Sequence, residues 1–245
     1  MKRFFITIEY DGTDLVGWQR QNNGPSVQAY IEEAALALTG EQVLVQGSGR
    51  TDAGVHATGQ VAHLDMPDRF DERAIMMGLN AKLTTSQVRI IAAQQVQDDM
   101  HARFSATNRA YLYRILNRPA PAAIARHFTW HIPKDLNIRA MQEAASHLIG
   151  KHDFTSFRAT ACQAKSPIRT IDSISIETMN EEIHISVEAP SFLHPQIRNF
   201  TGTLALVGKG RWTPQIVQDA LLAKDRSAAG PTAPPQGLYL TDIRF

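Results

Sequence analysis

The chain has little of several residues and patterns that would dictate its chemistry. Its 245 residues include one cysteine, Cys162, which leaves no internal disulfide framework and no thiolate cage for a metal ion. No apolar run approaches the ~20 residues of a membrane-spanning helix, and Glu9 and Asp11 interrupt the apolar start before it could serve as a secretion signal. We therefore expect a soluble, cytoplasmic protein with no membrane partner.

An excess of one charge is also lacking, since 25 Lys and Arg nearly balance 24 Asp and Glu. The distribution is uneven, however. Residues 101–134, 154–171 and 189–218 contain no acidic residue but carry several Arg and Lys. If these segments share one face, they form a basic surface that attracts phosphates. The alternative is that they lie on different faces, so charge alone leaves nucleic-acid binding open.

Hydrophobic periodicity predicts an α/β (α+β) protein with two similar halves. The first has strands near 4–9, 42–48, 58–65 and 87–97 and helices from the cap Ser26 to Leu38 and near 71–80. The second has strands near 111–116, 168–177, 182–188 and from 238, and helices near 138–149, 195–207 and 213–223. This repeated β-α-β-β-α-β order indicates ferredoxin-like or RRM-like halves with mixed, mostly antiparallel sheets. We expect residues 1–105 and 106–245 to form these halves, with their sheets meeting at a central cleft.

The most informative stretch is Gly47-Ser48-Gly49-Arg50-Thr51-Asp52-Ala53-Gly54-Val55-His56-Ala57, between two predicted strands. Three glycines around one carboxylate let the backbone turn tightly and let a ligand approach closely. Asp52 is either a catalytic carboxylate, a turn-capping residue or, with His56 and His63, part of a metal site, although no third ligand stands out. No Gly-Lys-Ser/Thr follows, so a phosphate loop has weak support.

The run Gly49–Ala57 resembles the signature of the tRNA pseudouridine synthase A family. Other stretches agree in the same order along the chain, namely Tyr10-Asp11-Gly12, Gly17–Gln21, His101–Thr107 with Arg109 and Tyr111, His152–Arg158, Phe192-Leu193-His194 with Arg198-Asn199, Ala223–Arg226 and Gly237–Leu240. The resemblance therefore covers essentially the whole chain. It departs at Pro195 and Gln196, where members usually carry a second histidine and a hydrophobic residue, so any role of that histidine is not carried over.

The resemblance implies roles for four site residues. Asp52 matches the catalytic aspartate, which bonds to the target nucleotide at uracil C6 or ribose C1′. Tyr111 matches the tyrosine that packs against the target base, and Arg198 matches the arginine that keeps the aspartate ionised. Arg50 resembles the arginine that enters the space left by a flipped-out nucleotide. From the residues alone, a core tyrosine and a phosphate-binding arginine stay open for Tyr111 and Arg198.

The resemblance also implies the substrate and the partners. RNA contacts are expected from Met100, His101, Ala102, Arg103 and Phe104, which suit backbone contacts and stacking, and from Gln163, Ala164 and Lys165. A homodimer would convert uridine to pseudouridine at positions 38, 39 and 40 of the tRNA anticodon arm, with no cofactor and no metal. Two other functions stay open: a non-catalytic RNA-binding module, and a carboxylate hydrolase of N-glycosides that would release free uracil.

Overall fold

The computed structural model describes residues 1–160 and 162–245 and divides into two compact units. Unit 1 comprises Met1–Thr107 and Tyr239–Phe245, and unit 2 comprises Asn108–Leu238. Residues 239–245 therefore group with unit 1, whereas the predicted boundary after residue 105 places them in the second half. Within the described ranges, no helix has both the length and the apolar character needed to cross a membrane.

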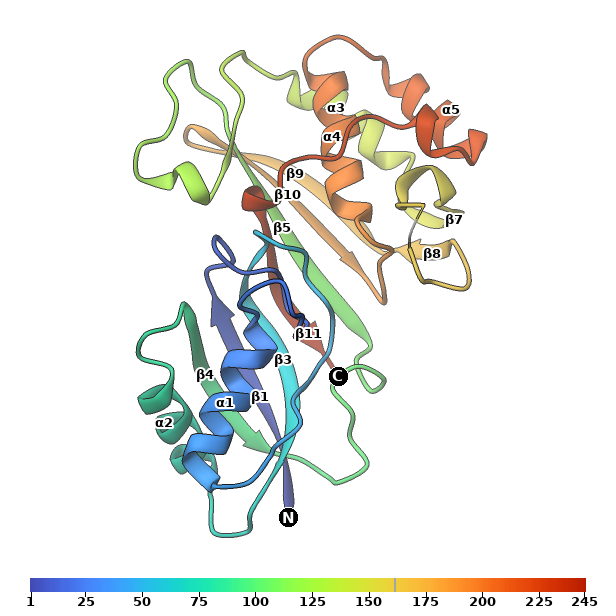
Figure 1. The fold of residues 1–245 in the computed structure, drawn as a ribbon. Helices are drawn as coiled ribbons and strands as arrows, with labels where there is room; N and C mark the ends of the chain where they lie inside the picture. The colour runs from blue at the N-terminus through green and yellow to red at the C-terminus, as the bar shows by residue number, and fades with distance from the viewer. Residues whose placement is uncertain (161) are drawn as a thin grey trace. The chain divides into compact units, whose positions relative to one another are not determined.

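Unit 1 is built on an antiparallel sheet in the order β4-β1-β3, with α1 and α2 on one face (Figure 1). Its elements are β1 (Lys2–Tyr10), α1 (Val27–Thr39), β2 (Gln46–Gly47), β3 (His56–Met66), α2 (Glu72–Lys82) and β4 (Val88–Gln95). This order confirms the predicted β-α-β-β-α-β unit. β2 is shorter than the predicted strand at 42–48. It pairs with β3 only at Ala62 and His63, while β11 (Leu238–Arg244) runs parallel to β3 at His56 and Ala57.

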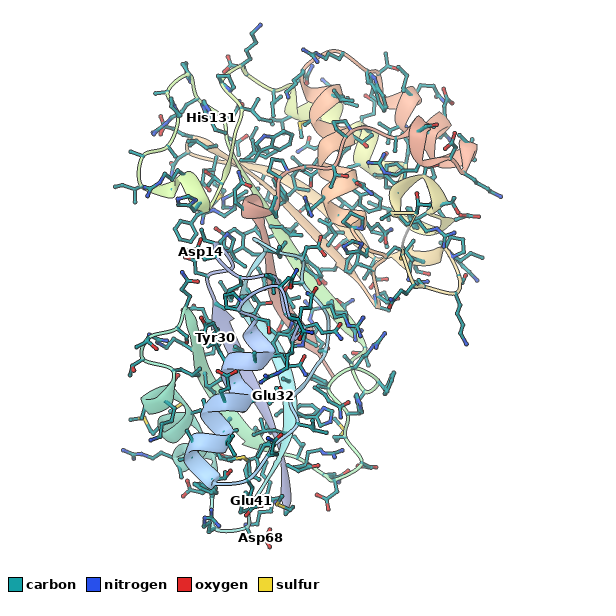
Figure 2. The ribbon with its side chains drawn as sticks, viewed as in Figure 1. Asp14, Tyr30, Glu32, Glu41, Asp68 and His131 are labelled. Carbon is teal, nitrogen blue, oxygen red and sulfur yellow. The ribbon has the colours of Figure 1, made fainter. Side chains whose placement is uncertain are left out.

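Local sequence determines where the helices of unit 1 begin and end. The Ser26 side chain accepts the Ala29 N–H at the start of α1, and Gly40 ends this helix in the left-handed conformation, with φ of 81°. α1 buries Val27, Ile31, Ala34 and Ala35. Tyr30 of the same helix, labelled in Figure 2, is only half-buried.

Unit 2 carries an antiparallel sheet in the order β5-β10-β9. Its main elements are β5 (Asn108–Leu116), α3 (Ile138–Ser146), β9 (Ser173–Met179), β10 (Glu182–Ala189), α4 (Gln196–Gly208) and α5 (Pro214–Ala223). The short strand β6 (Trp130–His131) runs parallel to β5, and β7 (Gly150–Asp153) pairs with β8 (Ile168–Ile171). The predicted strand at 168–177 is therefore divided between two sheets. The mixed α/β class with mostly antiparallel strands is confirmed.

The core of unit 2 includes a cluster of three fully buried aromatic rings. Phe154, Phe157 and Phe200 contact one another at ring-centroid distances of 5.1 to 6.4 Å. Phe200 belongs to α4, whose residues are almost all buried. This helix is thereby firmly held in its unit, and so is the backbone of Arg198 at its first turn.

Candidate functional site

The glycine-rich motif forms a loop between β2 and β3, residues 48–55, named here the Asp52 loop. Within it the Val55 N–H donates to the Asp52 carbonyl at 3.2 Å, and Gly54 has φ of 77°, which favours glycine. Arg50 is exposed and Asp52 is half-buried, whereas Thr51 between them is 8% exposed. The loop thus keeps the two charged side chains accessible and buries the residue that separates them.

Hydrogen bonds anchor the Asp52 loop on both sides of Arg50. The Thr51 Oγ1 lies 2.8 Å from the buried Tyr10 hydroxyl, and the Thr51 carbonyl accepts the Trp18 N–H at 3.1 Å. Before Arg50, the buried Gln60 Nε2 donates to the carbonyl of residue 49 at 2.9 Å. Arg50 and Asp52 therefore extend from a backbone that is fixed at each end.

Two glycines let the N-terminal segment 10–18 approach this loop closely. A Cβ at Gly17 would lie 2.5 Å from the Thr51 carbonyl oxygen, and a Cβ at Gly12 would overlap the Val55 carbonyl oxygen. Gly17 also has φ of 109°, a conformation that other residues rarely adopt. The resemblance includes the blocks 10–12 and 17–21 but predicts no role for them. Segment 10–18, which contains the first block and part of the second, supports the loop that carries Asp52.

His56, considered earlier as a metal ligand, is buried at the start of β3. Its Nδ1 accepts the Gly12 N–H at 3.0 Å and lies 3.2 Å from the Asp11 carboxylate, while its ring stacks on Tyr239 at 4.8 Å. This histidine therefore links segment 10–18 to β3. Across residues 1–160 and 162–245, no three His, Cys, Asp or Glu side chains are grouped so as to hold a metal ion.

The expected RNA-contact residues 100–104 lie in a turn after β4, named here the 98–105 turn. The Ala102 N–H donates to Nδ1 of the buried His63 at 3.2 Å. The His101 ring lies 4.4 Å from His63 and 4.4 Å from Phe104, and the Arg103 guanidinium lies over the Phe104 ring at 5.7 Å. Phe104 is 76% exposed. The turn therefore presents a cation and an aromatic face to solvent, above a buried imidazole.

Ionisable groups hold the 98–105 turn on unit 1. Arg3 donates from Nη1 to the carbonyls of Asp98 and Met100, at 2.7 and 3.2 Å, and makes two 2.8 Å bonds to the Asp65 carboxylate. These bonds raise the pKa of Arg3 and lower the pKa of Asp65. Burial, with smaller contributions from the neighbouring His101 and Arg3, lowers the pKa of His63 to about 4. His63 is therefore neutral at pH 7.

Tyr111 lies on β5 of unit 2, opposite Val187 of β10. It is half-buried, and its ring meets Phe192 edge-on at 5.3 Å. Tyr113 lies on the same face of the strand, is fully buried and donates its hydroxyl to the Pro234 carbonyl at 2.7 Å. Burial raises the pKa of Tyr113. Tyr113 is thus a core tyrosine of this strand, and Tyr111 is the more accessible of the two.

Arg198 lies in the first turn of α4 and is half-buried. Its Nε donates to the Ala233 carbonyl at 2.8 Å, and the Ala233 N–H donates to the Arg198 carbonyl at 3.0 Å. The same segment passes so close to the helix that a Cβ at Gly202 would overlap the Pro231 carbonyl oxygen. Both the helix and this crossing segment therefore determine where the Arg198 guanidinium lies.

Pro195 and Gln196, the departures from the family pattern, lie where α4 begins. Gln196 is 1% exposed, its Oε1 accepts the Leu193 N–H at 2.8 Å, and its own N–H donates to the Leu193 carbonyl at 2.7 Å. The glutamine thus closes the turn before the helix with two bonds to one residue. Its Nε2 is buried and has no hydrogen-bond partner among residues 1–160 and 162–245.

The second set of expected RNA contacts lies in the loop before β8. Gln163 and Lys165 are exposed and Ala164 is half-buried. Lys165 is followed by Ser166, whose hydroxyl accepts the Ile168 N–H at 3.2 Å where β8 begins. The two polar side chains are thus available to a ligand from this loop.

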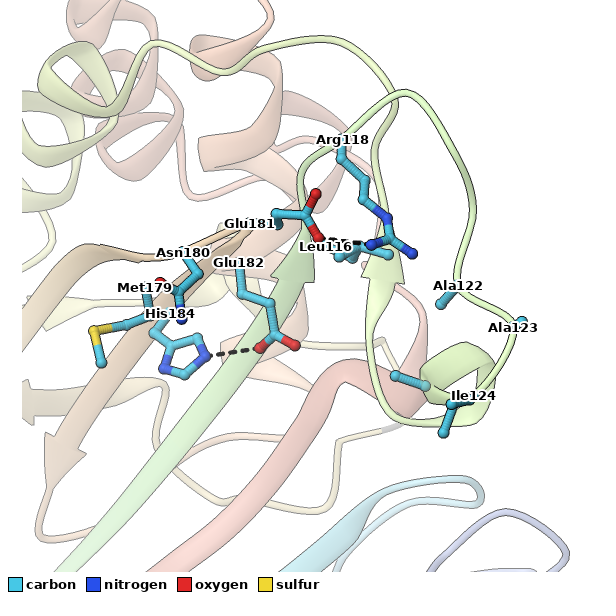
Figure 3. A pocket seen from close by; sticks show the side chains of 11 residues that line it. Leu116, Arg118, Ala122, Ala123, Ile124, Met179, Asn180, Glu181, Glu182 and His184 are labelled. Carbon is cyan, nitrogen blue, oxygen red and sulfur yellow. Dashed lines mark hydrogen bonds and ion pairs between the residues drawn. The ribbon is translucent and has the colours of Figure 1, made fainter.

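A cavity of about 580 Å³ in unit 2 contains no residue of the predicted site (Figure 3). It is lined by Leu116, Arg118, Ala122, Ala123, Ile124, Ala125, Met179, Asn180, Glu181, Glu182 and His184. Its charges are paired with one another: Arg118 contacts Glu181 at 2.6 Å, and His184 contacts Glu182 at 2.8 Å. Hydrogen bonds from Arg114 and His184 lower the pKa of Glu182.

Comparison with known proteins identifies the family. The chain matches the model of the family described as tRNA pseudouridine synthase over residues 6–105 and 144–245. It is 52% identical to tRNA pseudouridine synthase A of Rhodospirillum rubrum, over 100% of this chain and 88% of that protein. It is also 52% identical to tRNA pseudouridine synthase A of Sinorhizobium fredii, over 100% of both chains. The chain therefore belongs to the tRNA pseudouridine synthase family, which confirms the resemblance. It is an isomerase that acts on uridine in tRNA.

Proposed function

We propose that this chain forms pseudouridine at positions 38, 39 and 40 of the tRNA anticodon arm, with Asp52 as the covalent nucleophile. The observation that supports this assignment is the setting of Asp52 in its loop. The carboxylate is accessible, and the backbone on both sides of Arg50 is anchored by Tyr10, Trp18 and Gln60. A nucleophile held in this way needs little reorganisation before it attacks.

The proposed reaction conserves electrons. The N1–C1′ bond of uridine breaks, a C5–C1′ bond forms, the C5 proton is lost to solvent and N1 gains a proton. An adduct of Asp52 at C6 or C1′ lets the base detach, rotate and rejoin in separate steps. Neither an oxidant nor a reductant is consumed.

Further residues receive roles within the same proposal. Tyr111 packs against the target base, Arg198 keeps Asp52 ionised, and Arg50 fills the space that the flipped-out nucleotide leaves. Residues 100–104 and 163–165 contact the RNA, with Phe104 and Arg103 as the exposed aromatic and cationic groups. The active form is a cytoplasmic homodimer.

The decisive experiment replaces Asp52 and follows tritium release from tRNA labelled at uridine C5. Asp52→Asn should lower turnover by about 10³-fold or more and leave tRNA affinity unchanged, because the amide cannot form the covalent adduct. The exposed Asp68, labelled in Figure 2, provides the matched control Asp68→Asn, which should behave like the unaltered chain. Wild-type turnover in Asp52→Asn would remove Asp52 from the mechanism. In the unaltered chain, release of free uracil would instead indicate a hydrolase, and RNA binding without tritium release would indicate a binding module.

The role of Arg198 is tested by separating rate from affinity. Arg198→Ala should lower the single-turnover rate by about 10²-fold and change the Kd for tRNA far less, because the guanidinium acts on the nucleophile. Equal losses of rate and affinity would make Arg198 a phosphate contact.

A further inference from the structure

We infer that Tyr10 and Thr51 are positioning residues of the active site, whose buried pair of hydroxyls holds the loop that directs Arg50 and Asp52. The inference rests on the proposed catalytic role of Asp52. Tyr10 and Thr51 are uncharged and do not touch the substrate in the proposed reaction. Their inferred function is to position the two residues that do.

The hydroxyl pair restricts the loop because neither group has access to bulk water. Tyr10 is 2% exposed and Thr51 is 8% exposed, and the two oxygens are 2.8 Å apart. A buried hydroxyl that loses its partner costs about 1–3 kcal/mol. Loop conformations that separate the two oxygens are therefore disfavoured. Because the Trp18 N–H also binds the Thr51 carbonyl at 3.1 Å, both the side chain and the backbone of Thr51 are held.

The groups that hold Thr51 are themselves fixed by a sheet and a helix. Tyr10 ends β1 and lies opposite Ala57 of β3. The segment with Trp18 is joined to α1, since the Gln28 N–H donates to the Trp18 carbonyl at 3.0 Å. Arg20 contacts Glu32 of α1 at 2.9 Å, and Figure 2 labels this glutamate. The sheet and α1 thus fix the position of Thr51 through Tyr10 and Trp18. A precise site requires such support from regular elements.

The consequence should be kinetic, because Thr51 lies between two groups that are proposed to act on the same nucleotide. A displacement of about 1 Å at a reacting group can cost on the order of 10²-fold in rate. The expected RNA contacts at 100–104 and 163–165 lie in other segments, so affinity for tRNA should be retained. A structural role alone would lower stability and would not lower the rate of the folded enzyme.

The experiment compares two changes at Thr51 with the same change elsewhere in unit 1. Thr51→Val keeps the shape and removes the hydroxyl, whereas Thr51→Ser keeps the hydroxyl. Thr39→Val is the matched control, because the Thr39 hydroxyl donates to the Ala35 carbonyl at 2.8 Å at the end of α1. We expect Thr51→Val to slow single-turnover pseudouridine formation about 10- to 100-fold at unchanged tRNA Kd. Thr51→Ser should restore most of the rate, and Thr39→Val should leave it unchanged.

A double variant tests the pair itself. Tyr10→Phe should slow the reaction to a similar extent, and Tyr10→Phe with Thr51→Val should be no slower than the slower single variant, because one interaction is removed only once. The double variant removes both hydroxyls of the pair, so neither is left buried without the other. It can therefore be measured even if a single variant does not fold. A folded double variant with the wild-type rate would overturn the inference. So would additive losses, or equal rates for Thr51→Val and Thr39→Val. Activity in Asp52→Asn would instead contradict the proposed function. This result differs from the outcomes that contradict the role of Tyr10 and Thr51, so the two can be told apart.

Discussion

Two loops of unit 1 are held in place by different chemistry. The Asp52 loop is anchored by uncharged groups, namely the Tyr10 and Thr51 hydroxyls, the Gln60 amide and backbone N–H groups. The 98–105 turn is anchored by ionisable groups, Arg3 and His63, with Asp65 paired to the arginine. Salt weakens ion pairs, and a change of pH alters the charge of titratable groups. Hydrogen bonds between neutral groups are far less sensitive to salt and to pH. The hydrogen bonds that hold Thr51 and the carbonyl of residue 49 should therefore respond less to salt and pH than the groups that hold the expected RNA-contact turn.

A titratable group does touch the Asp52 loop's support at one point. The His56 Nδ1 accepts the Gly12 N–H and lies near the Asp11 carboxylate. This contact holds the start of segment 10–18, whereas the direct bonds to Thr51 come from Tyr10 and Trp18. The contrast thus concerns the bonds made by Thr51 and the carbonyl of residue 49 on one side and those of the 98–105 turn on the other.

Among the changes that separate these two loops, the largest expected effect comes from breaking the close approach of segment 10–18 to the Asp52 loop. Gly17→Ala places a Cβ 2.5 Å from the Thr51 carbonyl oxygen at φ of 109°, so the loop must move. We expect turnover to fall by about 10²-fold or more while tRNA binding is largely retained. The comparison uses tritium release and filter binding on the same preparations.

Gly40→Ala is the matched control for backbone strain. Gly40 has φ of 81° but nothing within 4 Å of a Cβ, so the substitution should cost about 1 kcal/mol of unfolding free energy and leave turnover unchanged. Equal turnover in the two variants would show that the close approach at Gly17 does not support the loop.

The second expected effect is the pH dependence introduced by His63. The pKa of His63 is about 4 in the folded chain and about 6.5 for an ordinary histidine in the unfolded chain, so the unfolded chain binds more protons between these values. The stabilisation is complete above about pH 6.5 and is lost as pH falls toward about 4, by roughly 3 kcal/mol in total. The groups that shift this pKa are His101, Arg3 and Asp65.

His63→Asn tests this dependence, because an asparagine oxygen can still accept the Ala102 N–H but does not titrate. Urea unfolding from pH 4 to pH 7.5 should show a smaller loss of stability at acid pH in the variant than in the wild type. If the two chains lose the same stability, the acid sensitivity of unit 1 originates from other groups.

The elements of the fold could be predicted where the signals are local. Ser26 and Gly40 mark the two ends of α1, because a helix cap and a left-handed residue each act within one helical turn. The length of β2 could not be predicted, because only Gln46 and Gly47 pair with β3, and no local pattern in residues 42–48 distinguishes these two from the rest. The strand at 168–177 was likewise wrong in extent, since its halves pair with β7 and β10.

The same distinction applies to the site. The glycine pattern and the family resemblance located Asp52 without any structure. Its supports were not found, because Tyr10 and Thr51 are 41 residues apart and Gln60 and Gly49 are 11 apart, with no periodic signal to join them. The roles of Asp52, Tyr111, Arg198 and Arg50, and the predicted central cleft, stay predictions that the kinetic experiments address.

The smallest expected effect concerns the charged anchor of the 98–105 turn. Arg3→Lys keeps the positive charge, but an ammonium group cannot bind both Asp65 oxygens and the carbonyls of Asp98 and Met100 as the guanidinium does. The turn should loosen, and tRNA affinity should fall several-fold, or about 1 kcal/mol, with turnover at saturating tRNA unchanged.

Arg89→Lys is the matched control, since Arg89 also binds carbonyls, at Leu83 and Ser86, at the other end of β4. Because exposed ion pairs are screened, the affinity difference between wild type and Arg3→Lys should narrow as salt rises. A loss of turnover in Arg3→Lys without a loss of affinity would contradict the separation of the two loops, because it would show that the charged anchor also sets the geometry of the Asp52 loop.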